Sequence, residues 1–419
     1  MKYKQTSQIV TVVLLAGITM FSCTQKNKKL EKMTNTFDKG TFGYDLNYLS
    51  DKDSLIILKS DNEEAQVIVS PKYQAKVFTS TAEGLKGKSL GFINYKVFDS
   101  GKIDEHMNGY GGENRFWLGP EGGQFSVFFE PDKEQIFDNW HTPKAVDTEA
   151  WVINGSSSKD VLMVKDMEVK NYQGNLLKIG VQRAVTLISN QEIEQKLGIK
   201  LSTKVKAVAY SNNNKITNKN NFEWTEKTGT VCIWLLDMFN PSPSALTIIP
   251  YNEGDEQTLG KVATTDYFGE IPSDRIKIEN DILYLKTDGK YRSKMGMNAK
   301  RTKSIAANYD SESKRLTIVT FDVELDKNYL NQEWNPKKNP LTGDALNAYN
   351  DGPLDDGSIM GPFLELESCS PAAFLKPGES LKHVQNVYHF VGDETDLSPI
   401  SERILGKPLT IIKQIFTVK

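Results

Sequence analysis

The sequence predicts an all-β protein with minor helical content, built from large antiparallel sheets. Runs of β-branched and aromatic residues recur at short, fairly regular spacing from Ser54 to Phe390, with turn-forming residues between them. The clearest short helical pattern is Asn190–Leu197. The sequence contains no repeat of the solenoid or propeller type. These features favour a sandwich or barrel of strands.

The first part of the chain is predicted to be rich in strands. Ser54–Ser60 and Ala65–Ser80 carry branched and aromatic residues bounded by Asp, Asn and Pro, and Ser89–Phe98 repeats the pattern. Gln124–Glu130 alternates in the manner of a strand. Phe137–Trp151 contains two Trp, a His and a Pro, and we expect an ordered loop there.

A long β-patterned run follows from Asp160 to Ile188, with Asn171–Asn175 as its expected turn. Asn190 is expected to cap the helix that comes next. Lys204–Tyr210 is predicted as a strand. Ser211–Asn221 is rich in Asn and Lys, and we expect it to form a surface loop.

Thr228–Phe239 is almost continuously apolar, which predicts a strand buried on both faces. The later strands have the same style of sequence. They are expected at Ala245–Pro250, Arg275–Thr287, Ser304–Tyr309, Arg315–Glu324, Pro362–Ser368 and Leu381–Phe390.

The composition is that of an ordinary soluble protein with a sizeable core. The chain has 419 residues, 38% of them hydrophobic, and a formal net charge of −3. Its 51 Lys and Arg nearly balance its 54 Asp and Glu, so nucleic acid is not an expected partner. We expect residues 37–419 to form one domain and the protein to be a monomer.

The N-terminus carries the pattern of a secretory signal peptide over residues 1–22. Lys2 and Lys4 precede the apolar run Ile9–Phe21, which is too short for a spanning helix. Cys23 directly follows the small Ser22, in a pattern that resembles the lipobox of bacterial lipoproteins. Acylation of Cys23 would attach the protein to a membrane of the bacterial cell envelope, facing the periplasm or the cell surface.

Two alternatives to the lipoprotein hypothesis are an ordinary secreted protein with a stray cysteine and a chain anchored by its uncleaved apolar segment. Residues 23–36 are polar and rich in Lys, as in a flexible tether. Cys232 and Cys369 are the remaining cysteines, and both lie among apolar or small residues. They are predicted to be free, buried thiols, with a disulfide between them as the alternative.

The densest group of candidate site residues is the stretch Tyr110–Glu130. It combines two Gly-Gly pairs with Arg115, Trp117, Glu121 and Gln124. Glycine lets the backbone approach a ligand closely, Arg and Glu supply directed hydrogen bonds, and Trp supplies a flat apolar face. This combination suits a polyhydroxylated ligand, and a tight hairpin with a solvated rim is the structural alternative.

Three segments resemble landmarks of the galactose mutarotase-like proteins. They are GGENRFWLGPEGGQF at residues 111–125, FNPSPSALTIIPY at residues 239–251 and PFLELESCSPAAFLKPGES at residues 362–380. Within that group the chain resembles uncharacterised secreted bacterial lipoproteins with a TSTA…GGE-RFWLGPEGG…W-TP layout. The resemblance covers about residues 70–390 and implies a β-supersandwich that binds a sugar in an open groove.

The resemblance implies catalytic roles for residues at opposite ends of the chain. Galactose mutarotases use a Glu on a late strand as general base, and the similar strand here carries Glu365 and Glu367. Being two residues apart, these carboxylates share one face with Phe363, and their proximity raises one pKa. Arg115 matches the Arg that polarises the sugar. The alternatives are a solvated strand face and an ion pair of Arg115 with a nearby Glu.

The sequence departs from the mutarotase pattern at the general acid. The place of its His is taken by Leu236, which has no proton to transfer. His141 is the candidate that would supply the proton from another wall, with a packing role as its alternative, and His106 is a second candidate. The predicted substrate-binding residues are Glu113, Trp117, Glu121, Gln124, Trp140, Tyr349 and Asn350.

No cofactor or metal is expected, because the four His are dispersed and no phosphate-loop, dinucleotide or zinc motif is present. The loop with Asp351, Asp355 and Asp356 is predicted to be an acidic surface turn, with a calcium site as the alternative. Tyr291–Lys294 is either a charged turn or a rim that binds anions.

The sequence therefore predicts a protein whose partner is a mono- or oligosaccharide. It is either a carbohydrate-active enzyme, of the epimerase and mutarotase kind or a glycan-cleaving kind, or a non-catalytic glycan-binding lipoprotein. A structural envelope protein with a degenerate site is a third possibility.

Overall fold

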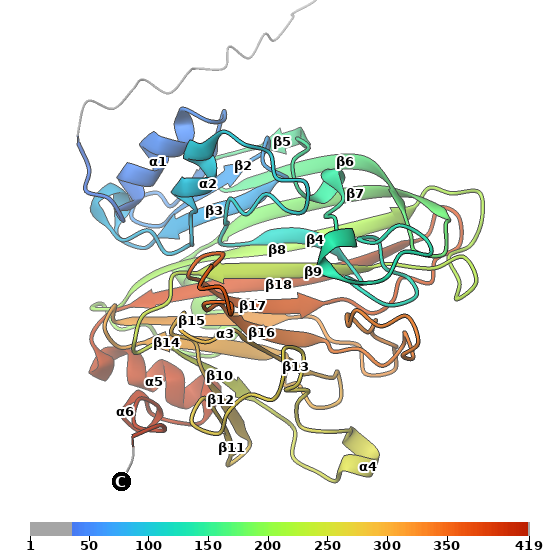
Figure 1. Ribbon diagram of the computed structural model, residues 1–419. Helices are drawn as coiled ribbons and strands as arrows, with labels where there is room; N and C mark the ends of the chain where they lie inside the picture. Colours follow the sequence, from blue (N-terminus) through green and yellow to red (C-terminus); the bar gives the residue numbers. More distant parts are fainter. Residues whose placement is uncertain (1–35, 418–419) are drawn as a thin grey trace, which may run out of the picture.

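The computed structural model describes residues 36–417, which fold into three antiparallel sheets (Figure 1). The predicted all-β class with large antiparallel sheets is confirmed. The ten-stranded sheet contains, in spatial order, β11 (Ile276–Glu279), β12 (Ile282–Lys286), β10 (Leu246–Pro250), β14 (Ile305–Asp310), β15 (Arg315–Phe321), β18 (Ser380–Val391), β8 (Lys206–Asn218), β7 (Leu176–Ile188), β6 (Asp160–Lys170) and β5 (Val152–Ser156).

The two smaller sheets join into one layer. The five-stranded sheet has the order β13 (Ser293–Met297), β16 (Leu346–Asn350), β17 (Leu364–Cys369), β9 (Cys232–Phe239) and β4 (Arg115–Gly119), and the three-stranded sheet consists of β1 (Ile56–Lys59), β2 (Gln66–Ser70) and β3 (Lys76–Thr81). Val77 and Asn114 exchange backbone hydrogen bonds of 3.0 and 3.1 Å. β3 therefore lies beside the start of β4.

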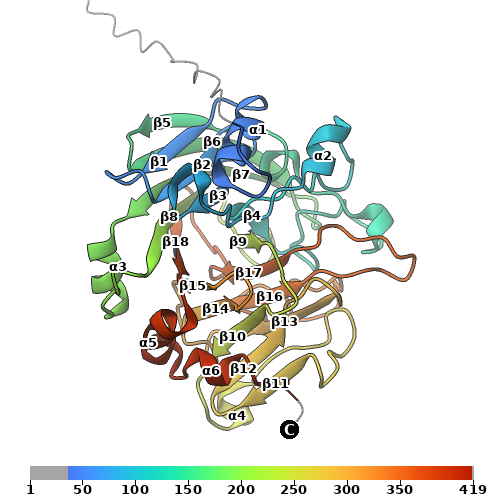
Figure 2. The same cartoon turned by 90° about the vertical axis from the view of Figure 1, so that its left-hand side faces the viewer.

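This layer packs against the ten-stranded sheet to form a sandwich, seen from its end in Figure 2. β9 is buried along its whole length, as its apolar sequence predicts, because both of its faces are covered. Leu235 and Leu366 of the five-stranded sheet belong to the same hydrophobic core as Val208 and Val387 of the ten-stranded sheet. The core between the layers is thus formed by alternate residues of each strand.

Buried polar side chains also connect the two layers. Arg183 of β7 donates to the side chains of Asn214 and Asn114, the first at 2.8 Å. Asn114 in turn donates to Asp237 of β9 and, at 2.6 Å, to Gln385 of β18. The interlayer network comprises these residues and three others that extend it. Its members are Asn114, Arg183, Asn212, Asn214, Asp237, Ser368, His383 and Gln385.

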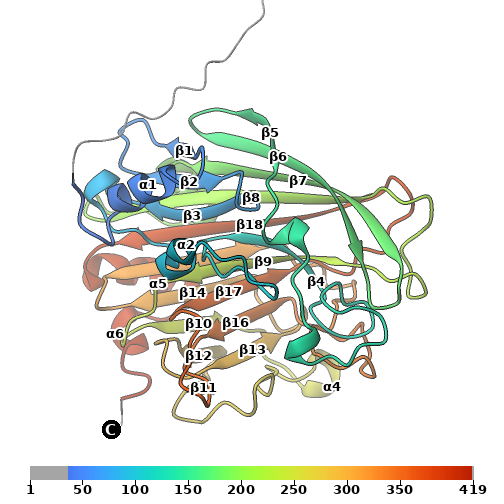
Figure 3. The same cartoon turned by 45° about the horizontal axis from the view of Figure 1, so that its top comes forward.

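Helices cover the sandwich on two sides (Figures 2 and 3). α3 (Asn190–Leu197), α5 (Glu394–Leu405) and α6 (Leu409–Ile412) form an apolar cluster with the outer face of the ten-stranded sheet. α1 (Phe42–Ser50) contributes to a separate cluster with the three-stranded sheet, which also contains residues of α2 (Tyr95–Ser100). Helix α4 (Glu256–Leu259) lies in the connection between β10 and β11.

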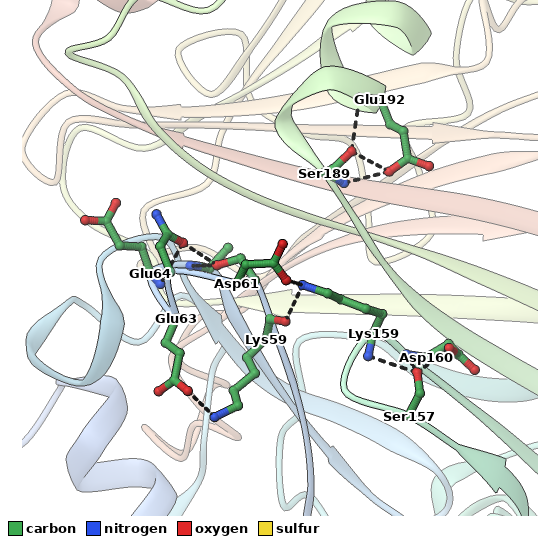
Figure 4. A network of polar contacts seen from close by, with 12 residues as sticks. Lys59, Asp61, Glu63, Glu64, Ser157, Lys159, Asp160, Ser189 and Glu192 are labelled. Atoms are coloured by element: carbon green, nitrogen blue, oxygen red, sulfur yellow. Dashed lines mark hydrogen bonds and ion pairs between the residues drawn. The ribbon is translucent and has the colours of Figure 1, made fainter.

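Polar contacts at one corner of the sandwich tie the β1–β2 turn to the β5–β6 turn (Figure 4). The Lys159 ammonium donates to the Lys59 carbonyl at 3.0 Å and to Asp61 at 2.6 Å. Figure 4 also shows the start of α3, where Ser189 and Glu192 form a reciprocal capping box. The helix prediction is confirmed, but its cap is Ser189, one residue before the predicted Asn190.

Three predicted segments are wrong. Ser211–Asn221 is largely strand, because β8 continues to Asn218 and turns alternate Asn side chains into the interlayer network. Ser89–Phe98 forms isolated bridges and then enters α2, whose first turn is capped by Asn94. Gln124–Glu130 contains no strand, and its backbone instead follows bends after the Gly122–Gly123 pair.

The N-terminal predictions lie outside the described residues. They concern the signal peptide, acylated Cys23 and most of the tether. Among residues 36–417, no helix is both long and apolar enough to cross a membrane. Cys232 and Cys369 are both buried and free, so the free-thiol prediction is confirmed.

Candidate functional site

The candidate site lies on the face of the five-stranded sheet that points away from the ten-stranded sheet, here called the site face. Strand register places Arg115 opposite Leu236, Leu236 opposite Glu367, and Glu367 opposite Asn347. Directly opposite residues in antiparallel strands project to the same side. One row of side chains therefore crosses β4, β9, β17 and β16 on this face.

Neighbouring rows add aromatic and charged groups. Trp117 lies opposite Trp234, and their rings meet edge to face with centroids 5.6 Å apart. On the other side of the central row, Glu365 lies opposite Tyr349, which lies opposite Lys294. The period-two prediction that Glu365 and Glu367 share a face is thus met by β17.

Each of the two carboxylates is held by a cation. Arg115 donates to Glu365, and Lys294 donates to Glu367 Oε2 at 2.9 Å. The Trp234 indole N–H donates to the same Oε2, also at 2.9 Å. Glu367 Oε1 has no hydrogen-bond partner among the described residues, although the side chain is only 1% exposed. An unpaired buried carboxylate oxygen is the kind of atom that a ligand or water satisfies.

A loop after β4 brings Glu121 to this group. The Glu121 backbone N–H donates to the Gln332 side chain at 2.6 Å, which fixes the loop against residues that follow β15. Burial raises the pKa of the Glu121 carboxyl to about 7, and the nearby Glu367 carboxylate adds to the rise against the opposing charge of Lys294. The Trp334 side chain acts to lower this pKa. Glu121 is thus partly protonated near neutral pH.

The other charged groups also respond to burial and to each other. Burial raises the pKa of Glu365, and Arg115 opposes the rise. Burial acts to lower the pKa of Lys294, but the Glu367 and Glu121 carboxylates outweigh it and raise this pKa. Lys294 therefore stays charged at neutral pH.

Residues 40–416 match a family described as a family of unknown function, DUF6786. The chain belongs to this family. No curated protein sequence matches the chain.

Several solved structures are similar to the chain in fold. The Slr1438 protein of Synechocystis sp. PCC 6803 has a TM-score of 0.46 and 12% identity, over 80% of this chain and 95% of that one. A galactose mutarotase related enzyme of Lactobacillus acidophilus has a TM-score of 0.45 and 8% identity, over 81% and 98%. A galactose mutarotase-like protein of Lactobacillus casei has a TM-score of 0.43 and 10% identity, over 80% and 99%.

The DUF6786 site brings together six of the residues predicted from the sequence, and their roles remain predictions. These are Arg115, Trp117, Glu121, Tyr349, Glu365 and Glu367. Glu113 lies elsewhere, fully buried between the layers, where it accepts from Ser80 at 2.7 Å and contacts His389 at 3.0 Å. The Asn350 side chain accepts from the Gly289 N–H and donates to the Tyr291 carbonyl. Gln124 is half-buried in the loop after Glu121.

The structure does not bring His141 and Trp140 into the group around Glu367. His141 lines a separate cavity of about 800 Å³, and its Nδ1 contacts the Glu105 carbonyl at 3.0 Å. Trp140 is buried and stacks on Trp334, with ring centroids 6.1 Å apart. His141 is thus not among the groups that surround Glu367, and Trp140 reaches the site only through Trp334.

Sequence reasoning did not assign Trp234, Trp334 or Lys76 to the site, and it considered Lys294 only as part of a possible rim. Trp234 lies within an almost continuously apolar run. Without alternation of polar and apolar residues, the sequence does not show which residues of this strand share a face with polar groups. Lys76 lies beside Arg115 on the extension of the site face, where burial and the Arg115 charge lower the pKa of its ammonium to about 7. A lysine within a β-patterned run is the signal that could have identified it.

The acidic loop after β16 is a structured turn. Asp351 accepts from the Gly361 N–H at 2.7 Å and from the Tyr349 hydroxyl at 3.1 Å, while Asp355 and Asp356 are exposed. Across residues 36–417, no three His, Cys, Asp or Glu side chains are grouped as the ligands of a metal ion would be.

Proposed function

We propose that the site face binds a carbohydrate and performs acid–base chemistry at a sugar ring. The observation that carries this proposal is the arrangement around Glu367. Lys294 and Trp234 both hold Oε2, while Oε1 has no partner within residues 36–417. A carboxylate fixed through one oxygen presents the other to a substrate proton.

Glu121 is the proton donor in this proposal. Leu236 occupies the centre of the row between Arg115 and Glu367 and has no proton to give. Glu121, whose pKa is raised to about 7, is a carboxylic acid for part of the time at neutral pH. A neutral acid and a carboxylate within one site are the pair that sugar ring opening, epimerisation and glycosidic cleavage each require.

The remaining groups suit a sugar. Hydroxyl groups pair well with Arg115, Lys294 and the carboxylates, and the C–H face of a sugar packs on aromatic rings such as Trp117 and Trp234. The resemblance of three sequence segments to galactose mutarotase-like proteins supports the same class of ligand. A carbohydrate ligand therefore fits both the chemistry and the sequence.

The decisive experiment measures turnover. The purified protein is incubated with a panel of aldoses and oligosaccharides, and NMR follows anomer exchange, epimerisation and cleavage. Glu367→Gln is expected to lower kcat by about 10²–10⁴-fold with little change in melting temperature. Glu279→Gln, at an exposed position of β11, is the matched control and leaves turnover unchanged. Equal turnover by wild type and Glu367→Gln contradicts the role of Glu367.

A non-catalytic glycan-binding protein is the second candidate. Leu236 favours it, because an apolar side chain stands directly between the cation and the carboxylate that would act together. In that case sugars raise the melting temperature and bind measurably, yet no product forms on long incubation with any member of the panel. Failure of every sugar to bind contradicts both candidates.

We also propose that the protein is a lipoprotein of the cell envelope, anchored through Cys23. The lipobox-like sequence and the polar residues after it support this proposal. Full-length protein expressed in a bacterium is expected in the membrane fraction and to incorporate labelled palmitate. Cys23→Ser should abolish labelling, and membrane attachment that persists without labelling would identify the uncleaved apolar segment as the anchor.

A further inference from the structure

A cavity of about 800 Å³ lies next to the site face and is not used by the chemistry proposed above. Its walls include Asn108, Phe128, His141 and Thr142, together with residues 166–170 at the end of β6. This volume is in the range of pockets that bind small organic ligands. Thr142 is only 7% exposed, and its hydroxyl has no hydrogen-bond partner among the described residues.

Flat rings are stacked at the edge of this cavity. The His106 ring stacks on His141 with centroids 4.9 Å apart and on Phe137 with centroids 4.5 Å apart. Phe137 is 58% exposed, so this stack is open to solvent and does not belong to the core. Exposed flat rings beside a polar cavity are suited to the C–H faces of sugar rings.

The same stack leads to the catalytic group. Phe137 stacks on Trp140 and Trp140 stacks on Trp334, each pair with centroids 6.1 Å apart. Trp334 in turn acts to lower the pKa of the Glu121 carboxyl. A continuous series of rings thus runs from the edge of the cavity to the proposed acid.

A second contact joins the cavity to the site face. Asp147 lines the cavity and accepts from the Asn108 side chain at 2.8 Å. Burial raises the pKa of Asp147, while Asn108 and the charges of Lys76 and Arg115 oppose the rise. The cavity adjoins the site face through Phe128, which lines the cavity and packs against Trp117 with ring centroids 5.4 Å apart.

We propose that this cavity is a subsite for additional sugar units, so that the substrate of the site face is an oligosaccharide chain. The inference rests on the proposed function, because it places further units of the same ligand next to the reacting one. The ring stack of Phe137, His106 and His141 would hold a sugar face, and Asn108 and Thr142 would meet its hydroxyls.

The test compares ligand lengths. Calorimetry measures the affinity of the full chain for β-1,4-linked glucose, mannose and galactose series and for an α-1,4-galacturonate series, each from monosaccharide to hexasaccharide. In the series that binds, the affinity is expected to rise about tenfold or more with length, since each aromatic contact adds to binding. Equal affinity for the monosaccharide and the hexasaccharide would overturn the proposal while leaving the proposed function intact.

Variants locate the effect. The double variant Phe137→Ala/His141→Ala is expected to lower hexasaccharide affinity about tenfold and leave monosaccharide affinity unchanged. Ile278→Ala, at an exposed position of β11, is the matched control. Unchanged hexasaccharide affinity in the double variant overturns the subsite. Absence of binding in every series overturns this inference together with the proposed function.

Discussion

The two faces of the five-stranded sheet both bury polar side chains, but they use them differently. On the inner face, Asn114, Asp237 and Ser368 belong to a network that bonds to side chains of the opposite sheet. On the site face, Arg115 and Lys294 pair with carboxylates of their own sheet. The first arrangement joins two layers, whereas the second joins strands within one layer.

The arginines of the two regions differ in how many of their donors are paired. Arg183 on the inner side of the ten-stranded sheet donates through all three of its guanidinium nitrogens to Ala75, Asn214 and Asn114. On the site face, Arg115 Nε and Glu367 Oε1 have no partner among the described residues. Asp237 Oδ2 and His383 Nδ1 of the interlayer network also have no partner among the described residues, so each face carries some unpaired buried atoms. An unpaired buried polar atom costs stability until a ligand or water satisfies it.

The largest expected effect is the loss of Arg183. Arg183→Met removes a donor from three acceptors that cannot reach water, and we expect it to lower the free energy of unfolding by about 3–5 kcal/mol. Urea denaturation followed by tryptophan fluorescence measures this loss. Arg115→Met is the matched comparison on the site face.

The Arg115→Met variant is expected to lose less stability than Arg183→Met. Its loss should be larger at pH 9 than at pH 6. Burial already raises the pKa of Glu365, so the carboxyl left alone by the substitution can bind a proton at lower pH. An Arg115→Met loss as large as that of Arg183→Met at pH 6 would remove the distinction between the two faces.

The second effect concerns Lys76, the buried cation beside Arg115. Its pKa is about 7 in the folded protein against a normal value of 10.5, so the unfolded state binds more protons between these values. Stability therefore rises with pH across that window and is lowest below pH 7. Lys76→Met is expected to be more stable than wild type at pH 6 by on the order of 2–4 kcal/mol, with the gain shrinking toward pH 10.

Melting temperatures across this pH range test the Lys76 prediction. Lys72→Met, at an exposed position in the β2–β3 turn, controls for the loss of a positive charge. A constant difference between Lys76→Met and wild type from pH 6 to pH 10 would show that the Lys76 ammonium has an ordinary pKa.

Glu121 should show the opposite dependence. Its pKa is about 7 in the folded protein against a normal 4.5, so between these values the folded state keeps a proton that the unfolded state has lost. Stability falls as pH rises through this window. Glu121→Gln is expected to remove the fall and to gain on the order of 1–3 kcal/mol over wild type at pH 8. The variant should be no more stable than wild type at pH 4.

The two faces also differ in how far they could be predicted from the sequence. The pairing of Glu365 with Glu367 on one face follows from the strand period alone, and β17 has this geometry. The Arg115–Glu365 contact joins residues 250 positions apart, and only the order of β4, β9 and β17 brings them together. Composition does not indicate that Arg115 and Glu365 lie close together. The resemblance of the surrounding segments to galactose mutarotase-like proteins suggested it.

The inner face was harder to predict because its chemistry contradicts the usual pattern. Asn212 and Asn214 are fully buried in β8, although a stretch rich in Asn and Lys normally indicates a surface loop. Their burial is possible because Gln385 and Arg183 satisfy them. Those partners lie far away in sequence, so nothing near residue 212 indicates a strand except the alternation with Lys215 and Ile216.

The smallest expected effect lies outside both faces, at the start of α3. Ser189→Ala removes the Oγ acceptor of the Glu192 N–H, and an exposed cap of this kind contributes about 1 kcal/mol. The loss should not vary between pH 6 and pH 9, because Ser189 does not titrate and the Glu192 pKa is lowered by its bonds to Ser189. Urea denaturation at the two pH values measures it. A Ser189→Ala loss equal to that of Arg183→Met would mean that the interlayer network contributes no more than one exposed helix cap, and the contrast between the two faces would then rest on the site face alone.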